Sequence, residues 1–377
     1  MLSIIGIIVI SLGILTWNHQ SKKSGEDLTK YDYVVSFYSI HQNGKMNPQT
    51  KIIFVNNDQE QLEFSDKVNK AGKLFQEGNT FRAYSFGGNK SLLFESSSGY
   101  STFSTSKGVL DSNIYTVNFA LNGMNGRIEV ITIDDGSTGE IRNTIQYTNP
   151  NHKVVTSPVI HAAIYHAVEI GTRLYFVGYD MVQDQYELFY LDEETNKVEY
   201  VDNWRYTSVE FEELLYVNGK IITAENPYNS RFMDGKDLSK TASLTTMDPE
   251  TLEPKSVSLD TKRIISAYAY NDHIRLVTVD NHLLEYTTDL ELVSDRDLSG
   301  TDFANLFTNT DYKFHGIRYL GNKAAAIVTP NTETTTELGK ILEFDADTLT
   351  LQKSITIPLS ENIGWKTDFA DLLIVEK

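Results

Sequence analysis

The chain carries few of the side chains on which most enzymes and metal sites depend. It has no cysteine and 8 histidines among 377 residues, so thiolate nucleophiles, disulfides and cysteine-bound zinc or iron–sulfur clusters are excluded. Imidazole is the usual general base and metal ligand near neutral pH, which makes the histidines the first candidates for chemistry. No P-loop, GxGxxG, HExxH, GxSxG or EF-hand spacing occurs. The sequence therefore predicts no catalytic residue set, no metal site and no cofactor.

Two of the histidines lie close together in the stretch HAAIYH. His161 and His166 are five residues apart, and on a regular strand an odd separation places side chains on opposite faces. They could hold one ion jointly only if a bulge interrupted the strand. The acidic segment DDGSTGE, residues 134–140, lacks the alternating oxygen ligands of a calcium loop, and a hairpin turn is expected there instead. Three further histidines fall at predicted strand ends or turns: His273, His282 and His315.

A polar insertion is the strongest candidate for a binding surface. ENPYNSRFMDGKDLSKT, residues 225–241, separates two predicted strands, and loops on a rigid scaffold commonly build binding sites. Aromatic, arginine and methionine side chains are enriched at protein interfaces. We therefore predict a binding loop, with an inert surface loop as the alternative. The residues predicted to make the contacts are Tyr228, Arg231, Phe232 and Met233. YTNPNHKVVTSP, residues 147–158, is a second candidate loop or a connection between two repeats.

A recurring phrase indicates the architecture that positions these residues. MDPETLEPKSVSL at 247–259 returns as LEFDADTLTLQKSITI at 342–357 and, in weaker form, as LFYLDEETNKVEYV at 188–201. The acid that opens the turn hydrogen-bonds the backbone of its own turn, and a following proline presets φ. Variable spacing of a constant local pattern is typical of loop insertions into equivalent units. The aligned turn residues are Asp134, Asp192, Asp248, Thr287 and Asp345.

Each unit also contains two earlier strand-like runs, joined by short turns such as VNGK and LGNK. Four antiparallel strands per repeat are the blade of a β-propeller. Such blades are predicted near 71–110, 113–150, 160–204, 206–260, 264–299 and 312–359. The segments left over, 31–66 and 365–377, supply the strands of a closing blade that removes exposed sheet edges. The sequence therefore predicts an all-β, seven-bladed β-propeller over residues 31–377, with six or eight blades as alternatives.

These turns and blade lengths resemble the bacterial β-propeller superfamily with YVTN-type and quinoprotein-like repeats, over about residues 70–360. The likeness is one of architecture. The Gly-His and Trp-Asp pairs of WD repeats do not occur, and the Gly-Gly pair of kelch repeats occurs once, at Gly87-Gly88. Tryptophan, frequent in quinoprotein-like blades, is limited to Trp17, Trp204 and Trp365. Because propellers host unrelated functions, the resemblance implies no activity.

The N-terminal residues indicate a location. Residues 2–17, LSIIGIIVISLGILTW, carry no charge. As a helix with a rise of ~1.5 Å per residue they span ~24 Å, slightly less than a ~30 Å hydrocarbon core. No small-x-small cleavage site follows, which favours an uncleaved membrane anchor over a removed signal peptide. Residues 18–30 are polar and predict a flexible stalk.

The orientation of this anchor rests on two opposing signals. Lys22 and Lys23 follow the apolar segment, and the positive-inside rule would hold that side in the cytoplasm. A large cysteine-free domain is typical of Gram-positive surfaces, and long domains translocate largely regardless of charge. We predict that the propeller lies outside the cell; a secreted protein and a propeller facing the cytoplasm are the alternatives.

The overall charge restricts the partners. Lys and Arg total 33 against 51 for Asp and Glu, a formal charge of −18, which repels phosphate backbones and argues against nucleic acid. We predict a membrane-anchored extracytoplasmic binding or scaffold module for an envelope protein, peptide or glycan. The alternative is a propeller enzyme of the glycoside hydrolase, lyase or lactonase type with carboxylates and a histidine in the central channel. Glycosidic cleavage needs two carboxylates ~5–9.5 Å apart.

Overall fold

Seven four-stranded antiparallel sheets are present in the computed structural model of the protein. It describes residues 26–42, 45–66, 71–85, 90–95, 99–104, 114–134, 142–180, 183, 185–206, 209–227, 241–331, 337–359 and 367–377. The chain is an all-β, seven-bladed β-propeller, which confirms the predicted fold class and blade count. It forms two compact units, residues 1–107 together with 361–377 and residues 108–360.

Both ends of the chain contribute to one blade of the first unit. Its strand order is β28 (Thr367–Ile374), β1 (Tyr33–Gln42), β2 (Lys45–Val55) and β3 (Gln61–Asp66), so the last strand of the sequence takes the first place in the sheet. The short helix η1 (Leu28–Lys30) precedes β1. The second blade of this unit consists of β4 (Ala71–Glu77), β5 (Thr80–Ser85), β6 (Lys90–Glu95) and β7 (Gly99–Ser104).

Polar contacts join β28 to the second blade. The carboxylate of Asp371 accepts a hydrogen bond from the backbone N–H of Leu74 at 3.0 Å. The Gln76 side chain donates to the carbonyl oxygen of Glu376 at 2.7 Å and accepts from its N–H at 2.8 Å. Asp371 and Gln76 are both buried, where an unpaired polar group is unfavourable. Pairing with β28 also satisfies the backbone groups along the edge of β1.

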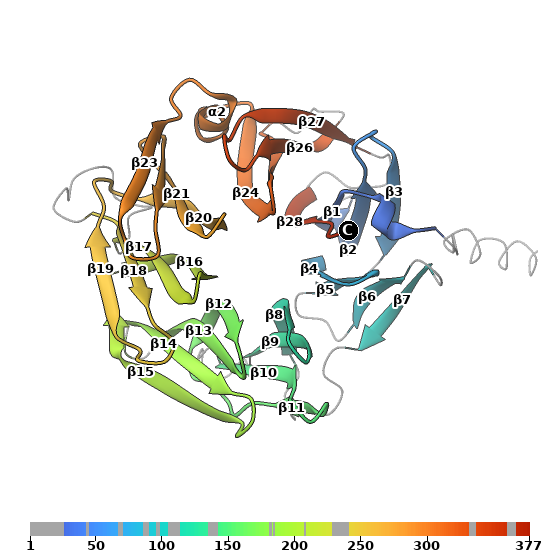
Figure 1. The fold of residues 1–377 in the computed structure, drawn as a ribbon. Coiled ribbons are helices and arrows are strands. Elements are labelled where there is room, and N and C mark those ends of the chain that lie inside the picture. Colours follow the sequence, from blue (N-terminus) through green and yellow to red (C-terminus); the bar gives the residue numbers. More distant parts are fainter. Residues whose placement is uncertain are drawn as a thin grey trace, which may run out of the picture. The chain divides into compact units, whose positions relative to one another are not determined.

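The second unit contains five consecutive blades (Figure 1). In Figure 1 the first strands β12, β16 and β20 lie on the inner side of their blades, and the fourth strands lie on the outer side. The five blades contain, in order, β8 (Ile114–Gly123), β9 (Gly126–Asp134), β10 (Arg142–Thr148) and β11 (Val154–Thr156); β12 (Ala163–Ile170), β13 (Arg173–Asp180), β14 (Gln185–Asp192) and β15 (Lys197–Tyr206); β16 (Val209–Val217), β17 (Lys220–Pro227), β18 (Ser243–Met247) and β19 (Pro254–Ser258); β20 (Ile264–Tyr270), β21 (His273–Thr278), β22 (His282–Tyr286) and β23 (Leu292–Asp297); and β24 (Tyr312–Leu320), β25 (Lys323–Pro330), β26 (Glu337–Asp345) and β27 (Leu351–Pro358), with the helix α2 (Asp302–Thr308) before β24.

The second strand of a blade in this unit is buried on both faces. Seven consecutive residues, 221–227, are buried in β17, whereas the fourth strand β23 is exposed along its whole length. On β13, Leu174 and Phe176 pack into one hydrophobic cluster, and Tyr175 packs into the next. Successive side chains of a strand point to opposite faces of the sheet. The three middle blades of this unit therefore each contribute to two cores, and consecutive blades of the unit stabilise one another.

The recurring turn lies between the third and fourth strands of a blade. Asp345 illustrates it, because its Oδ1 accepts hydrogen bonds from the N–H groups of Asp347 at 3.1 Å and Thr348 at 2.8 Å. Side chains that satisfy backbone donors in this way fix the turn and its register. Among the described residues, the same role is taken by Asn56, Asn149, Asp192, Asp248, Thr287 and Asp345.

Asp134 does not belong to this set, and its predicted alignment with the other turn residues is wrong. Asp134 ends β9, the second strand of its blade, and the equivalent turn of that blade opens at Asn149. The segment 147–158 is this turn together with the short outer strand β11. The alignment relied on acidic residues, whereas asparagine accepts the same backbone hydrogen bonds. Residues 135–140, the remainder of the acidic segment, lie outside the described residues.

Several of these turns contain a residue in the left-handed conformation. Leu252, Leu290 and Leu349 have φ of 57°, 69° and 53°, a region that side chains with a Cβ adopt at a cost in free energy. Leu349 is 1% exposed and packs in the hydrophobic cluster between the last two blades. Its N–H donates to the carbonyl oxygen of Asp345 at 2.8 Å. Burial of the leucine side chain therefore offsets the backbone strain of the turn.

The predicted membrane anchor, residues 2–17, lies outside the described residues, as does most of the predicted stalk. Within the described part of the chain, no helix has the length and hydropathy needed to span a bilayer. The anchor therefore stays a prediction.

Replacing Asp345 with alanine is expected to lower the free energy of unfolding by about 1–2 kcal/mol. The reason is that three donors lose their acceptor: the N–H groups of Asp347 and Thr348 and the Thr348 hydroxyl group. Urea unfolding followed by circular dichroism measures the change. Asp289→Ala is the matched control, because Asp289 is exposed in the equivalent turn of another blade and its N–H is a donor to Thr287. Equal losses in both variants would contradict this role of Asp345.

Candidate functional site

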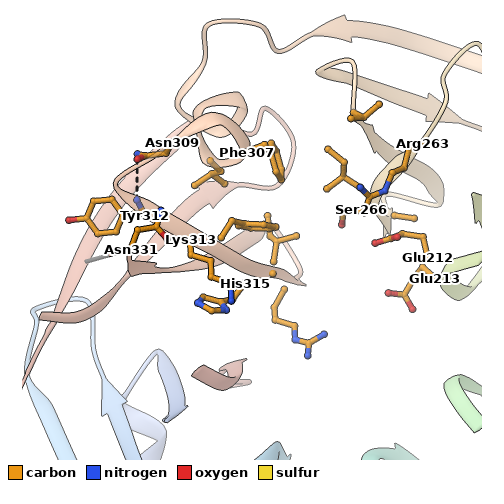
Figure 2. A pocket seen from close by; sticks show the side chains of 18 of the residues that line it. Glu212, Glu213, Arg263, Ser266, Phe307, Asn309, Tyr312, Lys313, His315 and Asn331 are labelled. Carbon is orange, nitrogen blue, oxygen red and sulfur yellow. Dashed lines mark hydrogen bonds between the residues drawn. The ribbon is translucent and has the colours of Figure 1, made fainter. Parts of the chain in front are cut away.

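A cavity of about 890 Å³ lies in the second unit, against the first strands of four blades (Figure 2). We call it the first-strand pocket. Its charged and polar lining residues on strands are His166 of β12; Glu212 and Glu213 of β16; Ser266 of β20; and Tyr312, Lys313, His315 and Arg318 of β24. Arg263, Asn309 and Asn331 line it from positions next to strand ends. Figure 2 shows Glu212, Glu213, Arg263 and Ser266 on one side, facing Tyr312, Lys313 and His315 on the other.

A β-bulge in each of these first strands shapes the pocket. The pairing register with the second strand shifts between Ile164 and His166 in β12, between Phe211 and Glu213 in β16, between Ile264 and Ser266 in β20, and between Phe314 and Gly316 in β24. A bulge inserts one extra residue and re-aims the side chains next to it. Consecutive residues such as Glu212 and Glu213 can therefore both line the pocket, which a regular strand would prevent. The extra residues are Tyr165, Glu212, Ile265 and His315.

His166 and Glu213 form the polar contact that crosses from one blade to the next. The Nδ1 atom of His166 lies 2.9 Å from Oε1 of Glu213, which also accepts the N–H of Leu214 at 3.2 Å. His161, predicted to share a strand with His166, precedes β12 and is exposed. The prediction that the two histidines lie on opposite faces of one regular strand is therefore wrong, because His161 is not part of β12. The bulge that would interrupt a regular strand is present beside His166. An imidazole held by a carboxylate at one nitrogen is oriented for proton transfer or ligand binding at the other.

Asn226 fixes the position of Glu212. Its side-chain oxygen accepts the N–H of Ile264 at 2.7 Å, and its amide donates to the Ile264 carbonyl oxygen at 2.9 Å and to Oε2 of Glu212 at 3.3 Å. Asn226 is buried, so these bonds are shielded from water. They connect the end of β17 to the start of β20 and hold a pocket carboxylate between two blades.

The opposite wall is aromatic and is supported by α2. The hydroxyl of Thr301 caps this helix by accepting the N–H of Ala304 at 3.2 Å. Phe307 of α2 packs edge-on against Phe314 of β24, with ring centroids 5.0 Å apart. His315 lies 2.6 Å from the Thr329 hydroxyl through Nε2. This wall therefore combines apolar rings with a polar imidazole.

The remaining predicted site residues fall elsewhere. His273 lies 3.1 Å from Glu285 and His282 lies 2.6 Å from Asp295, both away from the pocket lining. No cluster of three or more histidine or acidic side chains that could hold a metal ion occurs among the described residues. The predicted binding loop, residues 225–241, begins later than predicted, because residues 225–227 are the end of β17. Residues 228–240, with Tyr228, Arg231, Phe232 and Met233, lie outside the described residues, so their binding role stays a prediction.

Sequence reasoning missed most of the residues that line the pocket. Glu212, Glu213, Arg263 and Lys313 carry no motif, and nothing in the local sequence marks the bulges. The sequence predicts His315 at a strand end or turn, whereas it lies within β24 as the extra residue of the bulge. The one usable signal was the repeat itself, because equivalent positions in successive first strands must approach the same region of a propeller.

A pair of carboxyl groups lies in the blade β12–β15, apart from the first-strand pocket. Glu169 of β12 accepts the backbone N–H of Met124 at 2.5 Å, and Glu193, 2% exposed, follows β14. Burial and then the negative charge of Glu169 raise the pKa of Glu193 to about 7. Burial also raises the pKa of Glu169. Oε1 of each carboxyl is buried and accepts no N–H or O–H group, which one shared proton would satisfy.

The comparisons with known proteins show the fold. No protein-family model and no curated protein matches the chain. A mutant of the Synechocystis apocarotenoid oxygenase is 10% identical, with 92% of this chain and 94% of that chain covered and a TM-score of 0.52. The cobalt-substituted Synechocystis enzyme is 9% identical, with the same coverage and a TM-score of 0.53. Apo AztD from Citrobacter koseri is 11% identical over 89% of this chain and 97% of that chain, with a TM-score of 0.46. At such identities the likeness concerns the propeller fold alone.

Stability is expected to fall as the pH rises from about 5 to about 8, because the folded state holds a proton at Glu193 that the unfolded chain releases near its ordinary pKa. Glu193→Gln mimics the protonated group. This variant should lose most of the pH dependence. At pH 8 its free energy of unfolding should exceed that of wild type by roughly 2–3 kcal/mol. Urea unfolding at pH 5, 6.5 and 8 measures the change. Glu194→Gln, an exposed neighbour, should follow the wild-type curve; if Glu193→Gln does so too, the shared proton is refuted.

Proposed function

We propose that the protein is a binding module whose ligand enters the first-strand pocket. The single observation that carries this proposal is a cavity of about 890 Å³ lined by both acidic and basic side chains from four consecutive blades. Ligand sites are typically clefts of ~300–1,000 Å³ with apolar walls and a few convergent polar groups. Most of the polar groups here stand on strands, which holds their positions closely, whereas Arg263, Asn309 and Asn331 lie in the connections next to strand ends. An envelope peptide or glycan fits such a cleft, as does an inserted segment of an envelope protein.

The proposed setting is the cell envelope. Residues 2–17 would anchor the chain in the membrane, and the propeller would lie outside the cell. Of the predicted stalk, residues 18–30, only the part before η1 would link the two, because Leu28 of η1 is buried in the core of the first unit. The turn pattern supports a further proposal, that the blades are related to the bacterial YVTN-type and quinoprotein-like repeats. A formal net charge of −18 argues against nucleic acid as the ligand.

The His166–Glu213 pair favours an enzyme as the second candidate function. An imidazole oriented by a carboxylate at one nitrogen is the arrangement of a general base. In a lyase or lactonase, His166 would remove or deliver the proton, and cations of the pocket would stabilise the developing negative charge. Conversion of a retained ligand by wild type and not by His166→Asn would favour this candidate over simple binding.

Val279→Trp is expected to reduce ligand retention at least about tenfold, because Val279 is 44% exposed at the pocket and a larger ring would fill the cavity. The measurement is mass spectrometry of peptides and glycans that the immobilised full chain retains from a bacterial envelope digest. Val293→Trp is the matched control on the outer strand β23, where Val293 is 52% exposed. Equal retention by Val279→Trp and wild type would refute the pocket as the binding site.

Deleting residues 2–17 is expected to move the protein from the membrane fraction to the soluble fraction. Immunoblots of fractionated cells measure this change. Protease added to intact cells should digest the propeller of the full chain if it lies outside. Full protection in intact cells, followed by digestion after lysis, would exclude the extracellular location.

A further inference from the structure

In the first-strand pocket both glutamates have hydrogen-bond partners within the protein, whereas two of the basic side chains have none among the described residues. Glu213 is paired with His166, and Glu212 accepts the Asn226 amide. The side chains of Arg263 and Lys313 form no hydrogen bond and no ion pair with any described residue. The charges that stay available to a ligand are therefore positive, in a protein whose formal charge is −18.

Arg263 combines an anchored backbone with an unmet side-chain donor. Its backbone is fixed, since its carbonyl oxygen accepts the N–H of Val279 at 3.0 Å and the Thr261 hydroxyl at 3.4 Å. Its Nε atom is buried and has no hydrogen-bond partner. Arginine stays protonated at any physiological pH, so the unmet donor cannot be removed by losing a proton. An acceptor brought by a ligand would remove this unfavourable state.

We infer that the first-strand pocket takes an anionic ligand whose carboxylate or phosphate oxygens accept hydrogen bonds from the Arg263 guanidinium. Both oxyanions match the planar donor fork of arginine, which binds them through two parallel hydrogen bonds. Lys313 supplies a second positive charge from the opposite wall, as Figure 2 shows. Phe307 and Phe314, on the same wall as Lys313, offer an apolar surface to a ring or aliphatic body.

The neighbouring carboxylates make this site selective. Glu212 and Glu213 would repel a free anion that has no further contacts, and the net charge of the protein adds to that repulsion. A ligand with an anionic group and a hydroxyl-bearing or amine-bearing body places its donors on these carboxylates and its oxyanion on Arg263. Acidic sugars and peptides with a free carboxylate have this composition. The inference rests on the proposed binding function and specifies its ligand.

The test is isothermal titration calorimetry of the full chain in detergent with paired probes. Galacturonate is compared with galactose, benzoate with benzyl alcohol, and phenyl phosphate with both aromatic probes, so that carboxylate and phosphate are distinguished. At least one anion is expected to bind about tenfold or more tightly than its neutral counterpart. Anions that bind no better than their neutral counterparts, or no binding of any anionic probe, would overturn the inference.

Variants assign the effect to Arg263. Arg263→Gln is expected to weaken anion binding about tenfold or more, and Arg263→Lys, which keeps the charge without the fork, should fall between. Lys262→Gln is the matched control, because it removes one positive charge from the adjacent exposed position outside the pocket lining, and it should stay within twofold of wild type. Thermal unfolding checks that each variant is folded. Unchanged binding in Arg263→Gln would overturn the inference.

Failure of this inference and failure of the proposed function are distinguishable. If neutral probes bind, Val279→Trp abolishes their binding and Arg263→Gln does not, the pocket remains a binding site and its preference for anions is refuted. If envelope ligands are retained equally by wild type and Val279→Trp, the proposed function itself fails.

Discussion

A blade of this protein cannot bury its own faces. Its second strands are buried on both faces, as β17 is along residues 221–227, so each sheet depends on the sheets that pack against it. In the second unit, alternate residues of one strand enter two different cores, as Leu174 and Tyr175 do on β13. This mutual cover explains the gradient from buried second strands to exposed fourth strands. It also explains why the last strand of the chain supplies the first strand of the blade that contains β1.

The same packing leaves the first strands as the place for function. They lie on the inner side of the blades in the second unit and carry bulges at corresponding positions. A bulge breaks the alternation of the strand, so that Glu212 and Glu213 can both face the pocket. Cross-blade hydrogen bonds from Asn226 then hold these side chains. The scaffold is rigid because of apolar packing, and the site is polar because the register of each first strand shifts.

Electrostatics distinguish the pocket from the rest of the molecule. The surface is strongly acidic, yet the pocket gathers Arg263, Lys313 and two histidines around two glutamates. Each glutamate has a protein partner, whereas the Nε atom of Arg263 has none among the described residues. A different balance occurs at Glu169 and Glu193, where burial of two adjacent acids is stabilised by retaining a proton. Retention of this proton is expected to make stability depend on pH, and the lining of the pocket supports the proposed anionic ligand.

The sequence by itself determined the repeat, the seven blades and the polar turns, because these depend on local patterns: alternating apolar residues, short hairpin turns and a side chain that caps its own turn. Asp134 was aligned wrongly because the prediction looked for an acidic residue at the turn. The turn needs only a short side chain that accepts a hydrogen bond, and Asn149 takes this role. Tertiary structure alone decided the pocket. Bulges beside His166 and Gly316 arise from how two strands pair, and the approach of His166 to Glu213 joins residues of different blades. No local pattern encodes either, because both depend on backbone register and on packing between segments that are distant in the chain.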